Sequence, residues 1–107
     1  LNSFNITHIE QAVNWTDTKK IDFYVFCLSL KELQQHAAGA LFALAFNNPE
    51  NRDAIRDAEG IPPLVELASS GTDQKQLAAG ALWNLAIDNP QNRVAIREAG
   101  GIPPLVA

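Results

Sequence analysis

The sequence predicts an all-α fold built from a repeated helical unit. Residues 36–66 and 77–107 superpose without a gap at an offset of 41 residues, and 21 of the 31 aligned positions are identical. A period of this length is typical of solenoids whose unit holds two or three helices. Apolar residues in the best-defined helix recur at three- and four-residue spacing, which is the spacing of one helix face.

The first helix of each unit is marked by capping residues. Asn48 precedes Pro49, and this pair places a capping side chain before a proline at the first helical position. We expect Gly60 to end this short helix. The next copy has the same arrangement, with Asn89 as the cap and Gly101 at the end.

Two further helices complete the unit. The Pro62-Pro63 pair opens a second short helix, and the small and polar residues 69–73 form a turn after it. A longer helix is expected from about Gln74 to Ile87. Each unit is therefore a short, a medium and a long helix in that order.

Composition bounds the class of protein. The chain has 107 residues and a formal net charge of −4, with 47% hydrophobic and 19% charged residues. One small domain fits this length, and an acidic chain without a basic stripe is not expected to bind nucleic acid. No apolar run is long enough to span a membrane. Methionine is absent and the last unit stops inside its second helix, so we expect the chain to be a piece of a longer protein.

The residues of the repeat carry a family resemblance. The pattern A-A-G-A-L-x-N-L-A, followed by N-P-x-N-R-x-A-I-R-x-A-G-G-I-P-P-L-V, resembles the armadillo repeat over residues 36–107. The resemblance implies a right-handed α-solenoid of about 2.6 repeats, in which the third and longest helices (H3) line a concave groove. It also implies a protein-interaction module rather than an enzyme.

The N-terminal part departs from this pattern. Residues 1–34 are expected to be a degenerate repeat or a divergent capping segment, with residues 35–75 as one unit and 76–107 as a second, truncated unit. Thr7 and Glu10 form a capping-box pair, and Ile6, Ile9 and Val13 recur at helical spacing. Residues 21–30 are a candidate second helix. The alternative is an unrelated segment folded onto the first repeat.

The long helix has two faces. Placed at 100° per residue, its inward side is predicted to hold Leu77, Ala78, Ala81, Leu82 and Leu85. The opposite side carries one large apolar pair per unit, Phe42 with Phe46 and Trp83 with Ile87. Either these side chains pack between neighbouring long helices, or they line a groove that binds a partner. Aromatic side chains are enriched at binding hot spots, which favours the groove.

Gly80, Asn84 and Asp88 complete the predicted groove. Glycine in mid-helix costs about 1 kcal/mol relative to alanine and marks close approach by another helix or a ligand. In armadillo proteins that bind extended peptides, an asparagine at this H3 position binds the peptide backbone, and the resemblance gives this role to Asn84. Ala43 stands at the matching position of the previous unit, and glycine replaces the accompanying tryptophan. Both departures argue against binding of nuclear-localisation signals.

Other polar residues suggest no catalytic or metal site. Cys27 is expected to be a small core residue, and His36 a partly buried one. The aligned pairs Arg52/Arg93 and Arg56/Arg97 are expected to be solvated or paired with neighbouring carboxylates, or to meet an acidic partner. The glycosylation sequons at residues 5–7 and 14–16 are discounted, because the rest of the chain suggests a cytoplasmic or nuclear protein.

We therefore expect a non-catalytic module without metal or cofactor, which binds an extended peptide or a partner helix on its H3 groove. Two alternatives stay open. The chain is a self-assembly element that forms homo-oligomers through its exposed solenoid ends, or it is the substrate-recognition part of a larger protein such as a ubiquitin ligase.

Overall fold

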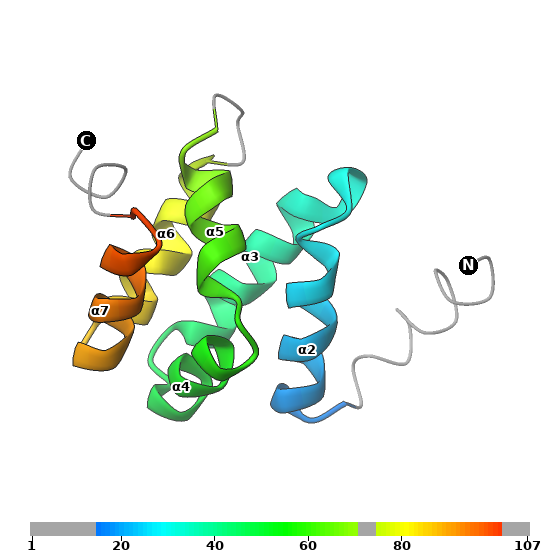
Figure 1. Cartoon of the computed structure of the whole chain (residues 1–107). Coiled ribbons are helices and arrows are strands. Elements are labelled where there is room, and N and C mark those ends of the chain that lie inside the picture. The colour runs from blue at the N-terminus through cyan, green and yellow to red at the C-terminus, as the bar shows by residue number, and fades with distance from the viewer. Residues whose placement is uncertain (1–14, 71–74, 102–107) are drawn as a thin grey trace.

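The computed structural model describes residues 15–70 and 75–101, and the regular structure of these ranges is helical (Figure 1). A short 3₁₀ turn, η3 (Lys31–Leu33), precedes the second of six α-helices. These helices are α2 (Asp17–Cys27), α3 (Gln34–Ala45), α4 (Pro49–Asp57), α5 (Ile61–Ala68), α6 (Lys75–Ala86) and α7 (Pro90–Glu98).

The helices recur at the period of the sequence repeat. Both α4 and α7 begin with proline, and both are capped by the preceding asparagine. The Asn48 Oδ1 accepts a hydrogen bond from the Asn51 N–H at 3.0 Å, and the Asn89 Oδ1 accepts one from the Asn92 N–H at 2.9 Å. The predicted helix starts are thereby confirmed, because each cap satisfies a backbone donor that has no partner within its helix.

The predicted helix ends are wrong by one residue. The left-handed residue after α4 is Glu59, with φ of 62°, whereas Gly60 has φ of −80°. A Cβ atom at Gly60 would lie 2.9 Å from the Ile55 Cγ2 and 3.0 Å from the Val25 Cγ2. Gly60 is therefore required by close packing between helices, and not by a turn.

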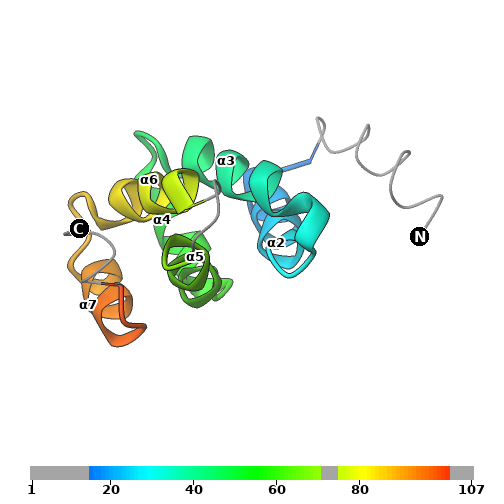
Figure 2. The same ribbon diagram turned by 90° about the horizontal axis from the view of Figure 1, so that it is seen from above.

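The helices form two rows. Seen from above, α3 and α6 lie side by side in one row, and α2, α5 and α7 lie in the other (Figure 2). The contacts of α5 with α6 and α7 are matched by those of α2 with α3 and α4. The close approach of Val25 to Gly60 likewise recurs between Val65 and Gly101. The element α2 thus has the position relative to α4 that α5 has relative to α7.

The core lies between the two rows. Of the predicted inward face of α6, four residues are buried and Leu77 is half-buried. Cys27 is buried as expected, but His36 is exposed and not partly buried. The equivalent residue, Leu77, reaches α3, whereas His36 has no described long helix on that side. The predicted capping box and apolar residues at positions 6–13 lie outside the described residues.

Candidate functional site

The predicted groove residues lie on the row formed by α3 and α6. Phe46 and Trp83 are 65% and 66% exposed, and Phe42 and Ile87 are each 38% exposed. We call these four side chains the apolar face. Exposed large apolar side chains that lie together in a patch are typical of surfaces that bind another protein.

Asn84 is buried beside this face, with 6% of its surface exposed. Its Nδ2 donates a hydrogen bond of 3.0 Å to the carbonyl oxygen of Phe42, so it links α6 to α3. The sequence argument gave Asn84 both a donor and an acceptor for a peptide. The structure uses one N–H of the Nδ2 within the chain, and the Oδ1 accepts no hydrogen bond from the described residues.

The Phe42 ring packs directly against Gly80. A Cβ atom at Gly80 would lie 2.5 Å from the Cε2 and 2.8 Å from the Cδ2 of Phe42, so no larger residue fits without moving the ring. The mid-helix glycine therefore marks the approach of an aromatic side chain from the neighbouring long helix. At Gly39, by contrast, the nearest atom to such a Cβ is the Leu77 Cδ1 at 3.9 Å.

Asp88 lies in the turn after α6 and is exposed. Its φ of 50° is left-handed, as is the φ of 52° at Asn47 after α3. Aspartate and asparagine tolerate this conformation better than most residues, because their short polar side chains bond locally. The turn geometry thus explains the residue type at position 88 without any ligand.

The Asn-Arg pair of the repeat motif caps the preceding long helix, a role that the sequence reasoning missed. In the first copy, Asn51 Nδ2 donates to the Leu44 carbonyl at 2.9 Å and Arg52 Nε donates to the Ala45 carbonyl at 2.9 Å. Asn92 and Arg93 make the same two bonds, of 2.9 Å each, to Leu85 and Ala86. Carbonyls of a last helical turn have no partner within their helix, so these side chains satisfy them.

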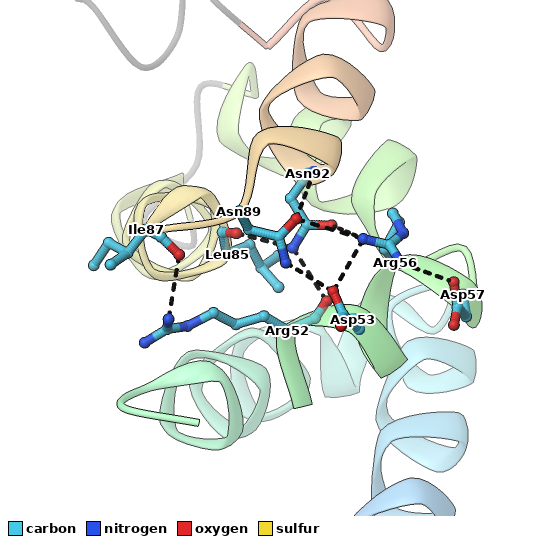
Figure 3. Close-up of polar contacts among 8 residues, drawn as sticks. All are labelled: Arg52, Asp53, Arg56, Asp57, Leu85, Ile87, Asn89 and Asn92. Carbon is cyan, nitrogen blue, oxygen red and sulfur yellow. Dashed lines mark hydrogen bonds and ion pairs between the residues drawn. The ribbon is translucent and has the colours of Figure 1, made fainter. Parts of the chain in front are cut away.

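The same residues join one unit to the next (Figure 3). Arg52 is buried, and its Nη1 donates to the Ile87 carbonyl at 3.2 Å, beyond the end of α6. The Nδ2 of Asn92 donates to the Arg52 carbonyl at 3.1 Å. The expectation that Arg52 is solvated or paired with a carboxylate is therefore wrong, because two helix ends supply its acceptors.

Arg56 behaves as expected. Its Nη1 lies 3.1 Å from the Asp53 Oδ1, and its Nη2 lies 3.4 Å from the Asp57 Oδ1. The Nη1 also donates to the Asn92 Oδ1 at 3.1 Å, and the Asn89 Nδ2 donates to Asp53 at 2.8 Å. These contacts cross from α4 to α7, so they fix the register of adjacent units (Figure 3).

Two cavities lie away from the apolar face. The larger, of about 390 Å³, is bounded by α2, η3 and α3 and lined by Phe23, Tyr24, Cys27, Leu33, His36 and Ala37. The other, of about 320 Å³, lies among α4, α5 and α7, and Arg56, Glu59 and Glu98 are among its lining residues. The sequence pattern contained no signal for either, because each forms where separate helices meet.

The described residues offer little metal or thiol chemistry. No cluster of three His, Cys, Asp or Glu side chains occurs among them. Burial raises the pKa of the Cys27 thiol, since it disfavours the charged thiolate. No helix in the described ranges is long and apolar enough to cross a membrane.

Comparison with known families matches residues 48–87 to the armadillo/beta-catenin-like repeat. This segment contains α4, α5 and α6, with the Asn48 cap at its start and Ile87 at its end. This match confirms the armadillo resemblance over this segment. Armadillo repeats generally mediate protein interactions and are typically non-catalytic scaffolds. Neither curated proteins nor solved structures give a significant match to the chain.

Proposed function

We propose that this armadillo-repeat chain is a non-catalytic module that binds an extended peptide or a helix of a partner protein on its apolar face. The observation that carries the proposal is the exposure of Phe46 and Trp83 by about two thirds, on adjacent long helices. Trp supplies a large contact area at low entropic cost and is the residue type most enriched among binding hot spots.

Asn84 and its neighbours support a backbone-directed role. Asn84 directly follows the exposed Trp83, and its Oδ1 accepts no hydrogen bond from the part of the chain that the structure describes. A peptide laid against Trp83 would offer a backbone N–H to this oxygen. Such a contact is independent of the peptide sequence, so side-chain selectivity would come from the apolar residues.

The charge around the apolar face favours an apolar ligand. Its four side chains carry no charge, and the exposed Gln35 and Gln76 of the same helices are neutral, although α6 begins with the exposed Lys75. Asp88 is the nearby carboxylate, at the end of α6. We therefore propose a partner segment with aromatic or aliphatic anchors, in which basic residues matter little.

The N-terminal helices bear on how many repeats the apolar face spans. We propose that α2 and α3 are the second and third helices of a divergent repeat, because their contacts with α4 parallel those of α5 and α6 with α7. In this proposal the apolar face spans two repeats of a right-handed superhelix of about 2.6 units. A cytoplasmic or nuclear location and a place within a larger protein, such as a ubiquitin ligase that selects substrates, remain predictions.

The test starts with peptides selected from a random-sequence library on the immobilised 107-residue chain. Each selected peptide is then titrated against Trp83→Ala by fluorescence anisotropy. Loss of a hot-spot side chain removes at least ~2 kcal/mol, so we expect binding to weaken about 30-fold. Because about two thirds of Trp83 is exposed, the variant is expected to stay folded.

Phe26→Ala is the matched control. Phe26 is also an exposed aromatic residue, but it lies on α2 in the other row. We expect its variant to bind as the wild type does. A combined Trp83→Ala, Asn84→Ala change should abolish binding. Because Asn84 also joins α6 to α3 through its bond to the Phe42 carbonyl, the stability of this double variant must be measured as well. Peptides that bind Trp83→Ala as tightly as the wild type would contradict the proposal.

A further inference from the structure

The cavity among α4, α5 and α7 is a second candidate binding site, away from the apolar face. Its volume is about 320 Å³, and it forms where the turn after α4, the start of α5 and the end of α7 meet. It is lined by four apolar residues, by Arg56, and by Glu59 and Glu98. Because α4 and α7 belong to successive units, stacking of the repeat creates this cavity.

The apolar part of the lining includes its most buried residue. Ile61 at the start of α5 is 1% exposed, and Ala95 and Ala99 are half-buried. Pro62, which completes this part, is exposed. An aliphatic chain that enters the cavity covers these carbon atoms, and covering apolar surface is favourable in proportion to its area.

The two glutamates of the lining carry charges that the fold leaves uncompensated. Glu59 follows α4 and Glu98 is the last residue of α7, and both are exposed. Neither carboxylate forms an ion pair or a side-chain hydrogen bond with the residues that the structure describes. Both therefore remain available to a cation that enters the cavity.

The positive charge of Arg56 does not neutralise these glutamates. Its Nη1 lies 3.1 Å from the Asp53 Oδ1, and its Nη2 lies 3.4 Å from the Asp57 Oδ1 (Figure 3). Two other carboxylates thus already face this guanidinium. Arg97 is a further cation on α7, but it is exposed and does not line the cavity. The cavity therefore has a negative charge beside an apolar surface.

We propose that this cavity receives an arginine side chain from a basic segment of a partner protein. The aliphatic stem packs on the apolar lining, and the guanidinium donates to Glu59 and Glu98. Arginine suits the site better than lysine, because its planar fork of five N–H donors can serve two carboxylates at once. This site lies apart from the apolar face, so the inference goes beyond the proposed peptide binding.

The backbone at position 59 agrees with this role. Glu59 has a left-handed φ of 62°, and the equivalent residue of the next unit is Gly100, with φ of 85°. Glycine adopts this conformation at a lower cost than glutamate does. The fold alone therefore favours glycine at this position, whereas binding of a cation requires the carboxylate.

The test is a ¹⁵N nuclear magnetic resonance titration of the whole 107-residue chain with the peptide acetyl-Gly-Arg-Gly-amide. At 0.15 M salt, charges more than about 8 Å apart are largely screened. Exposed ion pairs contribute little, so we expect saturable binding in the millimolar range, with the largest shifts at the amides of Glu59, Ile61 and Ala99. The same peptide with neutral citrulline in place of arginine should cause no shifts, and the lysine peptide should bind about two- to threefold more weakly.

Matched variants locate the contact. Glu59→Gln and Glu98→Gln should each weaken binding of the arginine peptide about two- to fivefold, as for the loss of one exposed ion pair. Glu66→Gln removes an exposed carboxylate of α5 that does not line the cavity, so it should bind as the wild type does. Glu59→Gly should raise the urea midpoint and still lose affinity, which separates binding from folding.

Four results would overturn the inference. These are unchanged affinity in Glu59→Gln and Glu98→Gln, an equal loss in Glu66→Gln, binding of the citrulline peptide, and lysine binding as tight as that of arginine. Trp83→Ala distinguishes this site from the apolar face, because it should lose the library-selected peptides and keep the arginine peptide. If the wild type binds the selected peptides but not the arginine peptide, this inference fails and the proposed function stands.

Discussion

Asn92→Ala tests the account of how successive repeats are joined. Asn92 is fully buried, and its Nδ2 donates to the Leu85 carbonyl at 2.9 Å and to the Arg52 carbonyl at 3.1 Å. Its Oδ1 accepts from the Arg56 Nη1 at 3.1 Å. The variant leaves the Leu85 carbonyl of the last turn of α6 without this donor and removes the bonds of Asn92 to Arg52 and Arg56 of α4.

The expected loss of stability follows from those contacts. An unsatisfied buried carbonyl costs about 1–3 kcal/mol, and a further lost hydrogen bond about 0.5–1.5 kcal/mol. We therefore expect Asn92→Ala to lower the free energy of unfolding by about 2–4 kcal/mol, which is a large part of the stability of a small domain. Urea unfolding followed by far-ultraviolet circular dichroism measures this loss, provided the slope m is unchanged.

Asn51→Ala is the matched control. Asn51 makes the same bond to the Leu44 carbonyl, but its second acceptor is the Asp17 carboxylate at 2.9 Å, and Asp17 is exposed. Water replaces that second bond, so we expect a loss of about 1–2 kcal/mol, as for one buried carbonyl. The reasoning is refuted if Asn92→Ala is no more destabilising than Asn51→Ala.

Four further variants follow from the backbone, the packing and the burial of the thiol. Gly80→Ala should lower the melting temperature, because the new methyl group displaces the Phe42 ring and such overpacking costs about 1–3 kcal/mol. Gly39→Ala should raise the melting temperature, because its methyl group has room and alanine in mid-helix is up to about 1 kcal/mol more favourable than glycine. Glu59→Gly should stabilise the chain by roughly 1 kcal/mol in urea unfolding, because a left-handed φ of 62° suits glycine. Burial raises the pKa of the Cys27 thiol in the folded chain. Above the pKa of an unfolded thiol, about 8.5, the unfolded chain therefore loses its thiol proton first. The contribution of Cys27 to the stability of the fold is complete below that pH and is lost as the pH rises through the raised pKa. The difference in urea midpoint between wild type and Cys27→Ala should therefore shrink from pH 7 to pH 10; a constant difference would show that burial does not govern this thiol.

The helices were predictable because local signals fix them. Asn48 and Asn89 lie directly before prolines, and both cap the predicted helix through their side chains. The periodicity of the long helix correctly separated its inward residues from Trp83. Caps and helical periodicity depend on residues within about one helical turn of each other, so they can be read from residue spacing in the sequence.

The roles of Arg52, Asn84 and Gly60 could not be predicted in the same way. Arg52 binds carbonyls at the ends of two helices, one of them 35 residues away. Asn84 bonds Phe42, which is 42 residues away, and Gly60 makes room for Val25. These contacts form only when neighbouring units stack. The partner of each residue lies in another unit, so the sequence around the residue does not reveal it.

The repeat motif also has a physical explanation. Its asparagine-proline pair starts one helix, and the asparagine-arginine pair three residues later closes the end of the preceding long helix. One short segment therefore orients two helices of successive units. The motif does not account for Trp83 and Phe46, which stay about two thirds exposed, whereas Phe42 is partly covered by its packing on Gly80.

The central claim is that the exposed residues of α3 and α6 bind a partner segment. The most direct measurement is a map of ¹⁵N chemical-shift changes across the chain on titration with a library-selected peptide. We predict that the largest changes fall on the apolar face and on the Asn84 side-chain amide, with little change at α7. Changes confined to α4 and α7, or to the cavity between α2 and α3, would contradict the account.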